Sequence, residues 1–171
     1  MGAIRFTTVP SPVGDLLVAA SDRGLTTLAF EVWKHGPSDA EQASWEKDDG
    51  QGTPGEILAQ ARAQLDQYFD RKRTGFDLPL DLAGTPFQIE VWQALRTIPY
   101  GSTISYGELA RRVRSPNGSR AVGAANGRNP VAIIVPCHRV IGANGDLTGF
   151  GGGMERKRWL LEHESGVKEL F

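Results

Sequence analysis

Residues 105–126 have the sequence SYGELARRVRSPNGSRAVGAAN, in which two short helix-forming segments flank a turn. Ser105 and Glu108 have the spacing of a capping box, which predicts a helix that begins there and continues through Val113. Proline, asparagine and glycine predict a turn over residues 115–118. A further helix is expected from Ser119 to Asn126. Two short helices joined by a tight turn are typical of a helix-turn-helix motif.

The second of these helices combines small side chains with an arginine at its start. Ala121, Gly123 and Ala124 let its backbone approach another surface closely, either a neighbouring helix or the groove of a nucleic acid. Arg120 lies at the N-terminal end, which is the part of a recognition helix that reaches bases.

Positive charge is concentrated around this motif. The whole chain has a net charge of −1, but residues 1–84 contain 8 basic and 13 acidic side chains, whereas residues 85–171 contain 11 and 7. Between Arg96 and Arg139 there are seven arginines and a single acid, Glu108. Arginine is suited to bidentate contact with phosphate. The pattern therefore favours a polyanionic partner over an ordinary solvated face.

The one cysteine of the chain follows in the stretch Val135-Pro136-Cys137-His138-Arg139-Val140. The neighbouring imidazole and guanidinium predict a positive field that lowers the thiol pKa, and the thiolate is the nucleophilic form. The alternative is an inert buried thiol after the apolar residues 131–135. Adjacent side chains do not face each other on a strand or a helix, so Cys137 and His138 are expected to communicate through a water molecule.

The same cysteine count limits the other possibilities. One cysteine cannot form an internal disulfide, which favours a reducing cytoplasm, and it excludes a cysteine-rich zinc site. The three histidines show no metal-ligand spacing. No apolar stretch approaches the ~18 residues of a membrane span, and the N-terminus lacks the apolar core of a signal peptide.

The N-terminal part of the chain predicts a small sheet with a helix. Phe6–Val9, 16–20 and 25–30 are separated by turn residues and predict an antiparallel meander. Residues 34–55 are polar and are expected to form a mobile surface loop. Apolar residues between Ile57 and Phe69 recur with helical spacing, so this helix should pack on the sheet.

A linker is expected where the charge balance changes. Residues 77–84 predict an extended segment, with the linker itself at 81–84, between an N-terminal domain over 1–80 and a C-terminal domain over 85–171. Thr85, Pro86 and Gln88 predict the start of a helix by N-cap, first-turn proline and capping box. The last helix is expected from Glu155 to about Glu164, after the glycines at 151–153.

Several motifs from Thr85 to Glu164 together resemble the O6-alkylguanine-DNA alkyltransferases, also called methylated-DNA–protein-cysteine methyltransferases. These motifs are Ile98-Pro99-Tyr100-Gly101, Ser105-Tyr106-Gly107-Glu108, Arg120-Ala121-Val122-Gly123, Asn129-Pro130, Pro136-Cys137-His138-Arg139, Gly149-Phe150-Gly151-Gly152-Gly153 and Trp159-Leu160-Leu161. The first 80 residues match only loosely. The resemblance implies an α/β (α+β) fold, with a ribonuclease H-like N-terminal domain and a helical C-terminal domain with a winged helix-turn-helix-like motif.

The resemblance also implies an activity. Such proteins repair double-stranded DNA by rotating O6-alkylguanine out of the duplex, at a cost of a few kcal/mol, and transferring the alkyl group to Cys137. The thioether product is not hydrolysed, so each molecule acts once. O4-alkylthymine is expected as a second substrate. No cofactor is implied, and no metal, because the cysteines that bind zinc in some relatives are missing here. A monomer is expected, with cooperative binding to DNA left open.

Catalytic roles carry over from the family to five residues. Cys137 is the nucleophile, His138 is the base acting through water, and Glu164 orients His138. Asn129 holds the active-site loop. Tyr106 helps to rotate the nucleotide and donates a proton to the departing guanine.

Other roles concern DNA and the base pocket. Arg120 fills the gap in the base stack, and DNA contacts are expected from Ser119, Ala121, Gly123 and Ala124 in the minor groove. The base pocket is expected to include Val140, Phe150 and Gly151. Phe150 stands where the family commonly has tyrosine, so a phenol contact to the base is missing here.

Two other functions remain open at this point. A cysteine hydrolase could use Cys137, His138 and an acid, but it would leave the arginine-rich helix pair unexplained. A lesion-binding alkyltransferase-like protein is the second alternative, and the presence of Cys137 argues against it.

Overall fold

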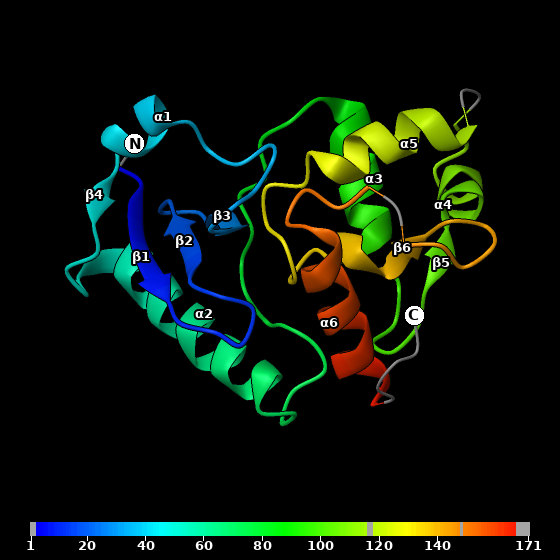
Figure 1. Ribbon diagram of the computed structural model, residues 1–171. Helices are drawn as coiled ribbons and strands as arrows, with labels where there is room; N and C mark the ends of the chain where they lie inside the picture. Colours follow the sequence, from blue (N-terminus) through cyan, green and yellow to red (C-terminus); the bar gives the residue numbers. More distant parts are fainter. Residues whose placement is uncertain (1–2, 116–117, 148, 167–171) are drawn as a thin grey trace. The chain divides into compact units, whose positions relative to one another are not determined.

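The computed structural model describes residues 3–115, 118–147 and 149–166, shown as a ribbon in Figure 1. The chain divides into two compact units, Met1–Ala83 and Gly84–Phe171. In the part of the chain that is described, every helix is too short or too polar to cross a membrane.

The first unit contains the predicted antiparallel meander. Strands β1 (Arg5–Val9), β2 (Leu16–Ala20) and β3 (Leu25–Phe30) pair in sequence order, with Val9 opposite Leu16 and Leu16 opposite Phe30. Helix α2 (Gly52–Phe69) packs on β1 and β2 through the apolar stripe expected from its sequence. Its members Ile57, Leu58, Ala61, Leu65 and Tyr68 are buried.

The prediction of a mobile loop over residues 34–55 is wrong for much of that range. A short helix α1 (Asp39–Ala43) begins at Ser38, which forms a capping box with Glu41. Strand β4 (Glu46–Lys47) then pairs parallel to β1, which gives the sheet order β3-β2-β1-β4. The polar composition was misleading because these side chains hold the backbone in place: Arg5 Nη1, for example, lies 2.6 Å from Asp49 Oδ1.

The predicted linker also begins later than its sequence indicates. Leu80 forms a parallel bridge with Leu25, and the Asp81 N–H donates to the Leu25 carbonyl at 2.8 Å. Ser21 Oγ donates to Asp81 Oδ2 at 2.6 Å. A Cβ at Gly24 would lie 2.6 Å from the Pro79 carbonyl carbon, so only glycine permits this approach. Residues 79–81 therefore extend the sheet of the first unit.

The second unit is mainly helical. Helix α3 (Pro86–Leu95) begins at Thr85 with the predicted capping box to Gln88. The helix-turn-helix pair is α4 (Tyr106–Arg112) and α5 (Gly118–Gly127), and Pro116 and Asn117 of the predicted turn lie outside the described residues. The chain continues through a 3₁₀ turn, η1 (Cys137–Arg139), to helix α6 (Met154–Ser165).

The second predicted capping box forms only in half. Ser105 Oγ accepts from the Glu108 N–H at 3.1 Å. The Glu108 carboxylate pairs instead with Arg111 and Arg112 on the next turn of α4, at 2.7 and 3.4 Å. Two nearby guanidinium groups outcompete a single backbone N–H for this carboxylate, because hydrogen bonds between charged groups are the stronger ones.

Helix packing fixes α5 within the second unit. Helix α5 packs against both α4 and α3. The indole N–H of Trp92 on α3 donates to the Ala125 carbonyl on α5 at 2.8 Å, inside the core. The short parallel pair β5 (Ile104–Ser105) and β6 (Val140–Ile141) joins the start of α4 to the chain just after η1. The helix-turn-helix and the cysteine motif therefore share one framework.

Candidate active site

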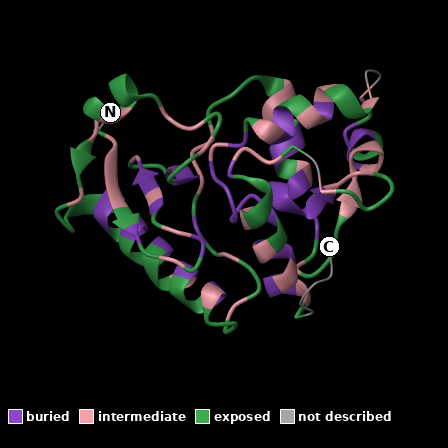
Figure 2. Cartoon of the chain, in the orientation of Figure 1, coloured by how far each residue is buried: buried purple, intermediate pink, exposed green. Residues whose placement is uncertain are grey.

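Cys137 lies at the start of η1, within a continuously buried segment. Residues 131–140 are buried throughout (purple in Figure 2), and Cys137 itself is 1% exposed. The carboxamide of Asn129 forms two hydrogen bonds to the backbone of this segment. Its Nδ2 donates to the Val135 carbonyl at 2.7 Å, and its Oδ1 accepts from the Val131 N–H at 3.0 Å.

The segment includes a strained residue. Ile133 has a φ of +70°, in the left-handed region that a β-branched side chain rarely adopts. Such a conformation costs roughly 1–2 kcal/mol. Its side chain is buried, so packing and the Asn129 hydrogen bonds together hold the backbone in this conformation.

Asn126 is a site residue that the sequence reasoning missed. It lies on α5, is 3% exposed, and its Nδ2 donates to the Cys137 carbonyl at 3.3 Å. This bond connects the second helix of the helix-turn-helix directly to the cysteine turn. A signal was available, because asparagine is a poor helix former and here it ends an apolar helix face.

His138 and Arg139 both turn toward Glu164 on α6. His138 Nε2 lies 2.8 Å from Glu164 Oε2. Arg139 donates to both carboxylate oxygens, at 2.8 and 2.9 Å, and its third bond goes to the Ile98 carbonyl at 2.7 Å. All three side chains are buried.

The ionisation of Glu164 fixes the role of the His138 nitrogens. Burial alone would raise the pKa of Glu164, but attraction and hydrogen bonds from His138 and Arg139 outweigh it and hold this pKa well below its ordinary value of 4.5. A carboxylate only accepts hydrogen bonds, so Nε2 carries a proton and donates it. In the neutral ring Nδ1 is then an acceptor. Nδ1 is buried and has no hydrogen-bond partner among the described residues.

The predicted low pKa of the Cys137 thiol is wrong. Burial raises the pKa of Cys137 to about 11, against smaller lowering effects from a hydrogen bond with Asn129, from the charge of Lys157 and from the backbone N–H groups of the turn. The imidazole and the guanidinium on which the prediction rested are both engaged by Glu164. Neither side chain is among the charges that lower the Cys137 pKa, although both are close to it in sequence.

The same orientation corrects the arginine count. Arg139 is 7% exposed and satisfies its donors inside the protein, so it does not belong to a surface that contacts a polyanion. The other six arginines are exposed: Arg96, Arg111, Arg112, Arg114, Arg120 and Arg128.

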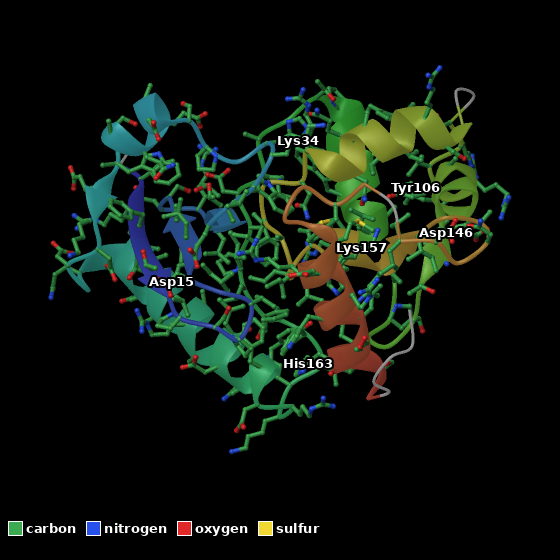
Figure 3. The ribbon with its side chains drawn as sticks, in the orientation of Figure 1. Asp15, Lys34, Tyr106, Asp146, Lys157 and His163 are labelled. Atoms are coloured by element: carbon green, nitrogen blue, oxygen red, sulfur yellow. The ribbon has the colours of Figure 1, made fainter. Side chains whose placement is uncertain are left out.

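Lys157 is the second site residue that was missed. It is fully buried on α6, and its Nζ donates to the Val140 carbonyl at 2.7 Å (Figure 3). Burial lowers the pKa of Lys157 to about 8, against an opposing attraction to Cys137. Positions 157, 160, 161 and 164 have the i, i+3, i+4, i+7 spacing of one helix face. That spacing could have shown that Lys157 and Glu164 point inward together with two leucines.

Tyr106 is the first residue of the helix-turn-helix and lies near both α5 and the glycine-rich segment. It is half-buried at the start of α4. A Cβ built at Gly123 on α5 would lie 3.7 Å from its ring, and one at Gly149 would lie 3.9 Å from its hydroxyl. The tyrosine ring therefore packs beside Gly123 of α5 (Figure 3 labels Tyr106).

The remaining residues, predicted for the base pocket and for contact with DNA, differ in their exposure to solvent. Val140 is buried, and Phe150 and Gly151 are half-buried. On α5, Ser119, Arg120 and Ala124 are exposed, whereas Ala121 and Gly123 are half-buried. The structure thus brings Cys137, His138, Asn129, Glu164 and Val140 into one buried cluster, and it leaves the start of α5 open to solvent. Within the described ranges no group of three or more His, Cys, Asp or Glu side chains could hold a metal ion.

Comparisons with known proteins cover both units. Residues 86–166 match the protein family described as 6-O-methylguanine DNA methyltransferase, DNA binding domain. Residues 4–82 match the family described as 6-O-methylguanine DNA methyltransferase, ribonuclease-like domain. The expected division of the fold into a ribonuclease-like part and a helical DNA-binding part is confirmed.

Individual relatives match over nearly the full chain. A methylated-DNA–protein-cysteine methyltransferase of Mycobacterium tuberculosis is 50% identical over 161 residues, which cover 94% of this chain and 92% of the relative. The Haemophilus influenzae protein of the same name is 43% identical over 165 residues, 96% of this chain and 88% of the relative. The crystal structure of M. tuberculosis OGT in complex with DNA matches with a TM-score of 0.83 and 49% identity, covering 95% of this chain and 92% of that one.

Proposed function

The chain belongs to the 6-O-methylguanine DNA methyltransferase family, and from this premise we propose how its residues carry out the transfer. The relationship inferred from the Pro136–Arg139 motif and its companions is confirmed. The protein is a DNA repair alkyltransferase that moves the alkyl group of O6-alkylguanine in DNA to a cysteine of its own. Neither a cysteine hydrolase nor a lesion-binding protein without a nucleophile is favoured by these relatives.

The acceptor is Cys137, because the chain has one cysteine and it lies in the buried cluster of the DNA-binding unit. A thiol with a pKa of about 11 is protonated at neutral pH. The reaction therefore needs a base in the site. The need for a base distinguishes the protein from cysteine enzymes whose thiol is already ionised at neutral pH.

His138 is that base. Glu164 holds the proton on Nε2, which leaves Nδ1 to take the thiol proton, and we assign a water molecule to the path between sulfur and Nδ1. The negative Glu164 also stabilises the imidazolium that results. Arg139 keeps Glu164 ionised and fixed, so its role is to position the acid rather than to contact DNA.

A sulfur electron pair forms the bond to the alkyl carbon while the bond from that carbon to guanine O6 breaks. The electron pair of the broken bond moves onto the guanine, which takes a proton from Tyr106 and leaves as the normal base. The proton held by His138 restores Tyr106 through solvent. The thioether has no proton to exchange and no bond that water cleaves readily, so one protein repairs one lesion.

The helix-turn-helix presents the lesion to this cluster. Arg120 is exposed near the start of α5 and can replace the rotated base in the stack. Ala121 and Gly123 are small and half-buried, so another surface can approach the backbone of α5 closely. Tyr106 packs beside Gly123. Ser119 and Ala124 complete the exposed side of the helix. These contacts fit a close approach to the minor groove.

The base pocket is assigned to Val140, Phe150 and Gly151, close in sequence to the cysteine turn and the glycine-rich segment. Phe150 offers an aromatic face without a hydroxyl, so recognition of the base edge there depends on other groups. O4-alkylthymine remains the second substrate that we expect. A reducing compartment, the cytoplasm, suits a protein whose single thiol must stay unoxidised.

The observation that carries this proposal is the arrangement of Cys137 next to a Glu164-bound His138 inside a DNA-binding unit. The test is to incubate the protein with a duplex carrying O6-methylguanine and to measure the mass of its peptides. One methyl group on the Cys137 peptide, at one lesion per protein, is the expected result. Repeated turnover with unmodified protein would contradict the proposal. Cys137→Ser is expected to bind the lesion without transfer.

A further inference from the structure

Two buried acceptor atoms at the cysteine turn have no hydrogen-bond partner among the described residues. They are Asn126 Oδ1 on α5 and His138 Nδ1 on η1. Asn126 is 3% exposed and His138 is 0% exposed, so bulk solvent reaches neither atom. Buried polar groups in native proteins are nearly always hydrogen-bonded, so each of these two acceptors requires a donor.

The orientation of the Asn126 carboxamide is fixed by its nitrogen. Nδ2 lies 3.3 Å from the Cys137 carbonyl oxygen, which accepts hydrogen bonds and cannot donate them. Reversing the amide would place two acceptors against each other, so the oxygen is the atom without a partner. The carboxamide therefore lies against the peptide group that joins Cys137 to His138, and its oxygen is an acceptor beside that turn.

The neighbouring polar side chains are already bound elsewhere. The carboxamide of Asn129 bonds at both ends to the backbone. The guanidinium of Arg139 and Nε2 of His138 bind Glu164, and the Lys157 ammonium donates to a backbone carbonyl. The one thiol of the turn carries a single proton, which cannot serve two separate acceptors.

A water molecule satisfies both acceptors at once. Water donates two hydrogen bonds, and a buried water typically has roughly two to four polar partners. Placed against the turn, it donates to Asn126 Oδ1 and to His138 Nδ1, and it accepts from the Cys137 thiol. A water in this position is the one that the transfer uses between sulfur and Nδ1.

We propose that Asn126 is a positioning residue for the proton relay: its Oδ1 accepts one hydrogen bond from the relay water and so directs the other hydrogen of that water toward His138 Nδ1. The inference rests on the proposed function of Cys137 and His138. It assigns to α5 a part in the chemical step, in addition to its contact with DNA.

The proton transfer balances with Asn126 in this role. As the S–H bond of Cys137 breaks, its proton joins the water oxygen, and the electron pair stays on sulfur for the bond to the alkyl carbon. The water hydrogen that faces Nδ1 moves to the imidazole, and the hydrogen held by Asn126 remains on the water. Without Asn126 the water is free to rotate, so sulfur, water and Nδ1 are aligned for a smaller fraction of the time.

The decisive variant is Asn126→Leu, which removes both polar atoms and keeps a side chain of similar size. Trp92→Phe is the matched control, because it removes a buried hydrogen bond to the Ala125 carbonyl of the same helix without touching the cysteine turn. Single-turnover transfer rates with an O6-methylguanine duplex are compared from about pH 7 to about pH 10, where a growing fraction of the thiol is ionised without the relay.

We expect Asn126→Leu to slow transfer roughly tenfold at neutral pH, which is part of the 10²–10⁴-fold that a positioned base contributes. The loss should shrink as the pH rises, because a thiol ionised directly by hydroxide bypasses the relay. Lys157, with a pKa lowered to about 8, titrates in this range in both proteins, so the ratio of their rates is compared.

A purely structural role of Asn126 would slow both routes alike. A ratio of wild-type to Asn126→Leu rates that stays constant with pH would therefore overturn the inference. Trp92→Phe is expected to lower the unfolding temperature and to give a rate profile parallel to that of the wild type.

A second measurement covers the case in which Asn126→Leu does not fold. A crystal structure of the unreacted wild-type protein should show an ordered water within hydrogen-bonding distance of Asn126 Oδ1, His138 Nδ1 and Cys137 Sγ. A thiol bonded directly to Oδ1, or a water that does not reach Asn126, would refute the inference. This structure needs no DNA, whereas absence of methyl transfer in the mass assay would overturn the proposed function whatever the crystal shows.

Discussion

The carboxylate of Glu164 lies 2.8 Å from the imidazole of His138, although 26 residues separate them in the chain. Helix α6 supplies the acid and the turn η1 supplies the imidazole, and both are buried. Because the same carboxylate also receives two hydrogen bonds from Arg139, one acidic side chain organises the whole segment after Cys137.

Glu164→Gln should slow transfer by about 10²–10⁴-fold, the usual contribution of a positioned general base. The amide no longer requires His138 to hold its proton on Nε2, so Nδ1 loses its defined acceptor role. Single-turnover kinetics with an O6-methylguanine duplex measure the effect. Glu162→Gln, on the same helix, is the control. A Glu164→Gln protein that is folded and fully active would show that His138 is not oriented by this contact.

The same carboxylate should make stability depend on pH. The pKa of Glu164 is lower in the folded protein than its ordinary value of 4.5. Its stabilising contribution is therefore complete above that value, and it is lost as the pH falls toward the folded-state pKa. Urea unfolding at neutral pH and near pH 3 should show a smaller acid-induced loss in Glu164→Gln than in the wild type. An equal loss in both would mean that other carboxylates dominate acid unfolding.

Asn129→Ala should destabilise the protein by about 2–4 kcal/mol, because it leaves the Val131 N–H and the Val135 carbonyl buried without their partner. It also releases the segment that holds Ile133 at positive φ and removes a hydrogen bond that lowers the Cys137 pKa. Thermal unfolding and thiol titration report the two effects. Asn144→Ala, at an exposed position, serves as the comparison. An unchanged unfolding temperature in Asn129→Ala would refute the role of this side chain in holding residues 131–135.

Arg120→Ala should impair repair in duplex DNA more than in single-stranded DNA, since only a duplex has a gap to fill after the base rotates. Arg128→Ala, also exposed near the end of α5, removes the same charge without that position. Transfer rates on matched duplex and single-stranded substrates decide the issue. Equal losses on both substrates for Arg120→Ala would leave only a general electrostatic role.

Local signals predicted most of the secondary structure. The capping box at Thr85, the strands of the meander and the apolar stripe of α2 each depend on residues within a few positions of one another. The short elements α1 and β4 escaped detection because their polar composition hid a capping box at Ser38 and a strand of two residues. Such a strand has almost no pattern of its own and exists because β1 offers an open edge.

The sequence by itself determined the family, and it singled out the arginine-rich helix pair and Cys137 as the acceptor that we propose, because these depend on residue types in a fixed order. Only the tertiary structure decided where the charges go. It paired His138 and Arg139 with Glu164, buried the thiol so that its pKa rises to about 11, and buried Lys157 on the neighbouring helix α6. The physical reason is that a pKa depends on burial and on distance in space, and chain adjacency fixes neither of them.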